Sequence, residues 1–491
     1  MVRVAERRAI AAALTLRMFA TVFRWEIRAL RRDPACWAVL VFAVAAMTFA
    51  IFNGVRWRAH LDTVAAASAA RDVSARVKAR AQAARIDARA EPAPFFTRDP
   101  RSAFGYANGV MAHYAVLPAT PLATLAAGQS DLLPSVLPLA PASLPSLAGG
   151  SEPENPHRLM IGRFDAAFAI VFFVPLVIIA LTYALLAGER ERGTLAMLLA
   201  QPLTLRSLFA AKLAPRVLLV LGLLGVLAAL FMLTVPGGAG PRLALWLAVA
   251  LAYTAFWFAL SATVIVRSGS TATHAVTLAA AWLALTMLLP AAINLAVKTL
   301  APMPSRIELI LALRAATDSA TAQRSRLLGA FYEDHPELSS AGGGGAGDFV
   351  TLQLVTNQRV EQDLAPVLSR YQDQLAIQQA LVDRLQFLSP ALLAETALAE
   401  SAGTGLARHH WFFAQALAHH AELRAFFDPR ALRKEKFTAW DDVPPFRFVE
   451  EPFADVAARV APALAALVLA ALALGLWSWW TLQRGSSEYR R

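Results

Sequence analysis

Six runs of about twenty apolar residues recur along this chain of 491 residues, and they constrain its fold more than any other feature. They occupy residues 35–52, 164–187, 217–235, 243–266, 275–297 and 456–480. A helix of about 20 apolar residues is long enough to cross about 30 Å of hydrocarbon. With 57% hydrophobic residues the chain is also too apolar for a soluble protein of this size. We therefore predict an all-α polytopic membrane protein with six transmembrane helices.

A basic segment, residues 1–34, precedes the first run. Its length and its eight arginines exceed what a signal peptide carries before its apolar core, so we expect an uncleaved anchor. Arg17, Arg24, Arg28 and Arg31 share one helical face. This spacing predicts an amphipathic helix that lies on the membrane with its arginines toward anionic lipids.

The excess of positive charge predicts the orientation of the six spans. The net charges are +5 for residues 1–34, +3 for residues 188–216, +1 for residue 267 and +2 for residues 481–491, which together account for the net charge of +11. Lysine and arginine accumulate on the cytosolic side of membrane proteins. We therefore expect both termini and residues 188–216 and 267–274 in the cytosol, and no nucleic-acid partner.

Two long segments, residues 53–163 and 298–455, face the other side in this topology. The first has twelve basic and eight acidic residues, and the second has fifteen and twenty. We expect these oppositely charged segments to pack as one mostly helical extracytoplasmic domain. The expected helices cover residues 55–90, 305–332, 348–364, 366–388, 390–401 and 405–427. Residues 117–156 hold eight prolines and are expected to be irregular.

The charged stretch 188–216 separates the second and third apolar runs. Thr194 is a candidate N-cap for a short helix over residues 195–200, which Pro202 would end. Thr204 is a candidate cap for a second helix that leads toward Lys212. The pattern therefore predicts a short helix that runs across the cytosolic face.

The order of residues in this stretch resembles that of a known family. From Glu189 the chain follows the pattern E-x-E-x-G-T-L-x-x-L-L-x-x-P with a later lysine, Lys212, which is found after the second span of ABC type-2 export permeases. The six spans and the basic N-terminal helix fit the same family layout. Residues 121–134 and 388–404 resemble strings that recur in a bacterial subfamily whose substrate is uncharacterised. The resemblance implies a permease subunit of a bacterial plasma (inner) membrane that works as a dimer, with a copy of itself or a paralogue.

The resemblance also implies a coupling helix over residues 189–202 that docks on a separate ATPase subunit. The residues that it assigns to this role are Glu189, Arg190, Glu191, Gly193, Thr194, Leu195, Leu198, Leu199 and Pro202. The glutamates would make polar contacts with the partner, and the leucines would fill its groove. Because the chain has no G-x-x-x-x-G-K-[ST] loop, we expect ATP and magnesium to bind to the partner and no cofactor to bind to this chain.

Three residues inside apolar runs are candidates for shaping a path through the membrane. Pro175 and Pro290 can kink their helices, and Asn294 could satisfy a carbonyl that Pro290 leaves free. A role in packing alone is an equal alternative. The substrate is not readable from any of these residues.

Catalytic and metal-binding patterns are not expected. We find no Ser-His-Asp arrangement and no H-E-x-x-H motif, and the histidine doublets 409–410 and 419–420 lie too far apart on a helix to share one ion. We therefore predict a non-catalytic subunit. The alternatives are a membrane sensor or scaffold with a ligand-binding outer domain and, less favoured, a membrane-embedded enzyme.

Overall fold

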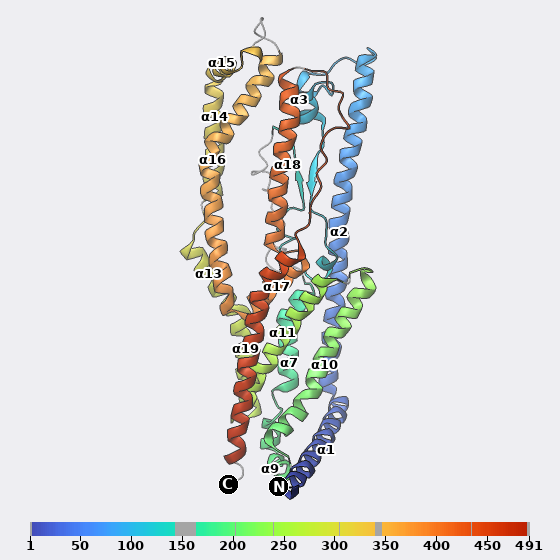
Figure 1. Ribbon diagram of the computed structural model, residues 1–491, viewed down its shortest axis with the longest axis vertical. Coiled ribbons are helices and arrows are strands. Elements are labelled where there is room, and N and C mark those ends of the chain that lie inside the picture. The colour runs from blue at the N-terminus through green and yellow to red at the C-terminus, as the bar shows by residue number, and fades with distance from the viewer. Residues whose placement is uncertain are drawn as a thin grey trace.

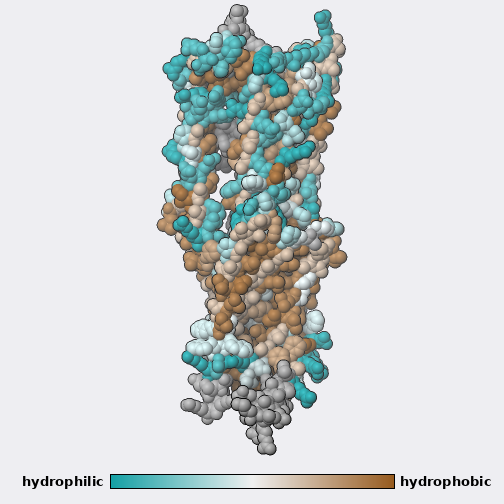
Figure 2. Space-filling model, viewed as in Figure 1, coloured by the Kyte–Doolittle hydropathy of each residue, from teal (hydrophilic) through white to brown (hydrophobic). Residues whose placement is uncertain are grey.

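The computed structural model describes residues 2–142, 164–201, 203–238, 240–303, 305–338, 346–433 and 435–488. It is an elongated assembly of helices that run along its long axis (Figure 1). The lower part is a bundle of apolar helices, and the upper part is a polar head built from residues 55–142 and 301–452, which we call the head. Figure 2 shows the apolar belt below the largely hydrophilic head.

Six helical segments of the bundle are long and apolar enough to cross a membrane. They are Pro34–Asp87, Ala166–Glu191, Leu205–Thr234, Pro241–Ile265, Thr271–Leu300 and Phe453–Arg484. Each contains most or all of one predicted apolar run, so the prediction of six helices long and apolar enough to cross a membrane is confirmed for the described residues. The chain thus has the helices of a multi-pass membrane protein.

The bundle is organised around α11 (Pro241–Ile265), which packs against α19 (Phe453–Glu488) and α7 (Val174–Thr182). Trp246, Tyr253 and Trp257 of α11 are fully buried. Large aromatic rings contribute much of the buried apolar area in such a core. The helix at the centre of the bundle is therefore held by packing against several spans.

The N-terminal helix α1 (Val2–Arg32) lies against α10 (Leu205–Thr234) and is followed at once by α2 (Pro34–Asp87). Asp33 caps α2 by accepting a bond from the amide of Ala35 at 2.9 Å. With 54 residues α2 is about 80 Å long, so it leaves the bundle and forms one edge of the head (Figure 1). The predicted continuation of the first span as a helix is confirmed.

Short elements follow α2 in the head. They are η1 (Phe96–Arg98), α3 (Ala103–Gly105), the π-helix η2 (Tyr106–Val110), β1 (Tyr114–Val116), η3 (Pro121–Thr124) and β2 (Val136–Pro138). Strands β1 and β2 are antiparallel, with Ala115 opposite Leu137. The segment expected to be irregular from residue 117 thus contains a strand, and its residues 143–156 lie outside the described residues.

The second segment of the head is mostly helical, as predicted. Its elements are α14 (Arg306–Ala322), α15 (Arg324–Asp334), η6 (Pro336–Leu338), α16 (Ala346–Leu385), η7 (Gln386–Leu388), α17 (Pro390–Ala402) and α18 (Leu406–Leu432). Two boundary predictions were wrong. The helix expected over residues 305–332 is divided at Gln323 into α14 and α15, and α16 continues through Pro366 where a break was expected. Pro366 is exposed, so water can solvate the carbonyl that it leaves free, while Val360 and Leu364 pack against α14.

The two segments of the head pack together through an aromatic core and through ion pairs. Tyr106 from the first segment stacks on Phe437 from the second, with ring centroids 5.0 Å apart. Lys436 pairs with Asp87 of α2 at 2.6 Å, and Arg80 of α2 pairs with Asp441. These contacts join residues from oppositely charged parts of the chain.

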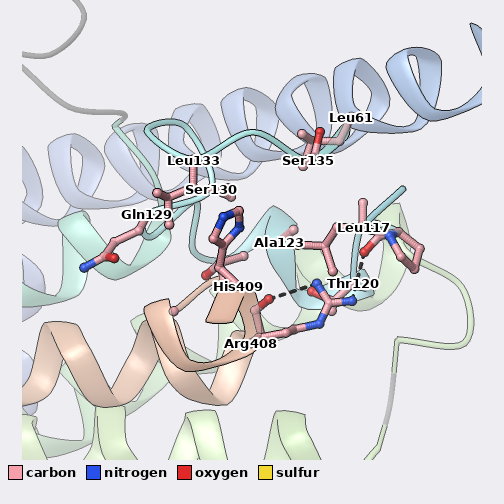
Figure 3. Close-up of a pocket in the computed structure, with 15 residues that line it drawn as sticks. Leu61, Leu117, Thr120, Ala123, Gln129, Ser130, Leu133, Ser135, Arg408 and His409 are labelled. Carbon is pink, nitrogen blue, oxygen red and sulfur yellow. Dashed lines mark hydrogen bonds between the residues drawn. The ribbon is translucent and has the colours of Figure 1, made fainter. Parts of the chain in front are cut away.

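The head meets the bundle where three distant stretches converge. Asp165, at the start of α6 (Ala166–Phe168), accepts bonds from the amides of Phe168 and Ala127, both at 2.7 Å. The amide of Gln129 donates to the carbonyl of Thr404 at 3.0 Å. Residues 121–134 and 388–404, which the sequence analysis noted, therefore meet at this boundary between the head and the bundle. Figure 3 shows the small pocket beside it, of about 30 Å³, with His409 of α18 pointing toward the loop that carries Ser130.

Candidate coupling site

The charged stretch after the second span folds into two short helices, α8 (Ala187–Glu191) and α9 (Thr194–Leu199). Gly193 stands between them with φ of +73°, a left-handed conformation that favours glycine. The predicted N-cap Thr194 is the first residue of α9, and its hydroxyl instead bonds to Glu189. Gly193 therefore forms the turn between the two helices, and Thr194 joins the start of α9 to α8 through its hydrogen bond to Glu189.

Glu189 of α8 takes part in a buried ionic network. Lys212 of α10 donates to Glu189 at 2.9 Å and to Glu26 of α1 at 2.5 Å. Arg216, one turn further along α10, donates to the other oxygen of Glu26 at 2.9 Å. We call these four residues the junction network. It connects the N-terminal helix, the stretch after span two and the beginning of span three.

Because the junction network is buried, its stability depends on every one of its four residues. Glu26, Glu189 and Lys212 are 2%, 6% and 4% exposed. Its two carboxylates are balanced by one ammonium and one guanidinium group, so the cluster has no net charge. Burying a charge is costly unless an opposite charge and hydrogen bonds compensate it. The relative position of α1, α8 and α10 is therefore fixed by charge pairing.

The other side of α8 is fastened to the loop between α11 and α12 (Thr271–Leu283). Glu191 accepts bonds from the amide and from the hydroxyl of Thr271, both at 2.7 Å. Arg190 donates to the carbonyl of Arg267 at 2.8 Å. Because Thr271 begins α12, the carboxylate of Glu191 also lies at the favourable N-terminal end of that helix. A five-residue helix thus contacts span three on one side and span five on the other.

The short helix α9 presents a mixed surface. Leu195 is buried in a small core beneath it, and Leu198 and Leu199 are partly buried against the same core. Met197 is 70% exposed. Pro202 lies outside the described residues. The large apolar side chain that α9 exposes is therefore that of Met197, which the motif does not single out.

Several residues assigned to coupling make contacts within the chain. The carboxylates of Glu189 and Glu191 bond within the chain, and Leu195 fills the chain's own core. Sequence reasoning missed Glu26, although it lies opposite the arginine face of α1, where a lone acidic residue needs an explanation. It also missed Arg216 and Thr271, because their partners are far away in sequence.

Both prolines predicted to kink spans follow π-helical turns. Pro175 comes after η4 (Ala169–Phe173) and Pro290 after η5 (Ala284–Leu288). Since proline lacks an N–H, the carbonyl of Val171 loses its usual donor four residues later. Tyr253 of α11 supplies the missing bond through its hydroxyl, at 2.9 Å. The irregular turn of span two is thus stabilised by span four.

The prediction for Asn294 differs from what is observed. Asn294, in α13 (Leu289–Leu300), is exposed. The carbonyl of Leu285, in the π turn before Pro290, accepts a bond from the hydroxyl of Ser389 at 3.2 Å. Ser389 caps α17, so a helix of the head contacts the irregular turn of span five.

The histidines of α18 are separated in space. His419 lies against His113, with their Nε2 atoms 3.0 Å apart, and His420 lies within 3.1 Å of the carbonyl of Ala140. Burial, and then the neighbouring His419, lower the pKa of His113 to about 4. Within the described residues no group of three or more His, Cys, Asp or Glu is arranged to hold a metal ion.

The fold and this site define a helical, multi-pass type of membrane protein. Residues 306–449 match the model of a family described as a domain of unknown function, DUF3526. The match covers most of the second segment of the head, from α14 through α18. Searches of curated proteins and of solved structures gave no match.

Proposed function

We propose that this chain is the permease subunit of a bacterial ABC type-2 transporter. In this proposal a separate ATPase subunit binds ATP and magnesium, docks on α9 and drives movement of the spans. The chain itself is non-catalytic, and it pairs with a second permease, either a copy or a paralogue. Export is the proposed direction, on the resemblance of the stretch from Glu189 alone.

One observation carries the proposal. The stretch that resembles a coupling helix leaves Met197 exposed on α9, while α8 is bonded to α10 and α12, and through Lys212 of α10 to Glu26 of α1. A displacement of α9 therefore acts on two spans and on the N-terminal helix together. Rigid elements with few, specific contacts are suited to transmitting such a movement.

The placement of basic residues supports a cytosolic position for this end of the molecule. Figure 1 shows α1, α9 and the end of α19 together at the lower end. Arg206 lies over the ring of Trp479, and Arg267 lies over that of Trp477, at 5.1 and 5.3 Å from the ring centroids. Tryptophan and arginine side chains are typical of the membrane–water interface. We propose that both termini are in the cytosol of a plasma membrane.

Copurification from the native host tests the proposal. We expect a subunit with a phosphate-binding loop to elute with the full chain in near-equal amounts. Met197→Glu should abolish this association, because a charge would enter an apolar contact, and Met197→Leu should preserve it. Unchanged association of the glutamate variant would refute the docking site. Recovery of a kinase or regulator in place of the ATPase would favour the sensor or scaffold alternative.

A further inference from the structure

A second site is formed where α1, α2 and α10 meet. These helices enclose a groove of about 270 Å³. Its lining includes Leu30, Arg31, Trp37, Leu40, Leu218 and Leu219. Arg31 is the only charged member of this lining, and most of the others are aliphatic. A groove with this composition suits a ligand that is apolar along its length and negatively charged at one end.

The charge around the mouth of the groove is strongly positive. Arg28, Arg31 and Arg32 are exposed, and none of them forms an ion pair in the part of the chain that the structure describes. The nearby carboxylate of Asp33 caps α2, and Glu26 is already balanced by Lys212 and Arg216. Arginine binds phosphate groups through planar, charge-assisted hydrogen bonds.

The helices around the groove indicate what kind of anionic ligand it can bind. The groove lies between the start of α2 and the middle of α10, and both helices are apolar enough to cross a membrane. Trp37 is exposed at its edge and donates to the carbonyl of Arg31 at 2.9 Å, which is the placement typical of an interfacial tryptophan. The groove therefore opens where acyl chains and phosphate headgroups meet.

We propose that this groove binds an anionic phospholipid, with one acyl chain against Leu40, Leu218 and Leu219 and its phosphate on Arg31. The aliphatic wall favours a lipid over a free phosphate, because a soluble anion leaves that wall uncovered. The bound lipid fills the space between α1 and α10. This inference concerns binding alone and does not depend on the proposed transport function.

Native mass spectrometry of the full chain in detergent tests the proposal. Added phosphatidylglycerol should be retained in preference to phosphatidylcholine. Arg31→Ala should weaken retention of phosphatidylglycerol about tenfold, since one charge-assisted contact is lost. Arg17→Ala is the matched control, because Arg17 lies on the same face of α1 about 21 Å away. It should retain the lipid like the unmodified chain.

A second variant tests the apolar wall independently. Leu218 is exposed in the groove, so Leu218→Trp should fill it and lower retention of both lipids without disturbing the core. Leu233→Trp, at an exposed position near the other end of α10, is its control. Equal retention of the two lipids, or full retention by both Arg31→Ala and Leu218→Trp, would overturn the proposal. Displacement of the lipid by soluble glycerol phosphate would also overturn it, because the headgroup alone would then account for binding.

Discussion

Lys212 on α10 and Glu189 on α8 form a buried ion pair with 2.9 Å between Nζ and Oε1. The pair joins the stretch after span two to the start of span three, and Glu26 of α1 shares the same lysine. The packing of α1, α8 and α10 against one another thus depends on the ammonium group of Lys212.

Removal of the shared lysine should be strongly destabilising. Lys212→Met leaves two buried carboxylates with only Arg216 and the exposed Arg192 nearby, and breaking a buried pair in this way costs about 3–5 kcal/mol. Thermal unfolding in detergent, followed by intrinsic fluorescence, measures the change. Arg192→Ala is the control, because its 68% exposed side chain also contacts Glu189, and its loss should cost less than about 1 kcal/mol. Equal effects of the two variants would contradict the network.

Acidic pH should weaken the head. Burial and the neighbouring His419 lower the pKa of His113 to about 4, whereas an unfolded histidine titrates near 6.5. The unfolded chain therefore binds the proton first, and stability falls as the pH drops from about 6.5 toward 4. Between pH 7.5 and pH 5 the loss should be roughly 2 kcal/mol.

Thermal unfolding of the detergent-solubilised chain at both pH values measures this dependence. His113→Gln should reduce it, since the substituted amide does not titrate. His335→Gln, at an exposed position, should leave it unchanged. A chain whose stability is the same at pH 7.5 and pH 5 would contradict the assignment.

Two glycines in long helices should respond oppositely to alanine. A Cβ on Gly54 of α2 would lie 1.8 Å from the carbonyl oxygen of Thr124, so Gly54→Ala must push α2 away from the loop. We expect a loss of more than about 2 kcal/mol from this overpacking. A Cβ on Gly222 of α10 meets no atom within 4 Å, so Gly222→Ala should be neutral or stabilise by up to about 1 kcal/mol. Urea or thermal unfolding distinguishes the two, and similar losses would refute the close approach.

The bond from Tyr253 to the π turn of span two can be isolated by a double-mutant cycle. Tyr253→Phe removes the donor to the carbonyl of Val171 and should cost about 1 kcal/mol. In a Pro175→Ala background the restored N–H can serve that carbonyl, so the same substitution should cost less. Additive effects in unfolding measurements would show that the tyrosine and the proline act independently.

The sequence predicted well those features that depend on neighbouring residues, such as helices and their ends. It predicted poorly the contacts between residues far apart in the chain. The length of the apolar runs predicted the six candidate spans, and the helix expected from residue 390 does begin at Pro390, the first residue of α17. The junction network could not be predicted, because Glu26 and Lys212 are 186 residues apart and only the packing of α1 on α10 brings them together. The break expected at Pro366 was wrong because a proline inside a helix destabilises it less where water can solvate the carbonyl that the proline leaves without a donor.

The candidate site shows the same division. Gly193 and the helix after Thr204 follow from turn and capping chemistry, and Thr204 does cap α10 through the amide of Ser207 at 3.1 Å. The inward orientation of Glu189 and the outward orientation of Met197 depend on how α8 and α9 sit on α10. A motif lists residues, whereas tertiary packing decides which of them are free for a partner.

Site-specific crosslinking tests the central claim most directly. A photo-reactive residue placed at Met197, at the lower end of the molecule, should capture an ATP-binding subunit in cells. The same residue at Leu311, exposed on α14 of the head, should not capture it. Capture from Leu311 and none from Met197 would contradict both the docking site and the proposed orientation of the chain.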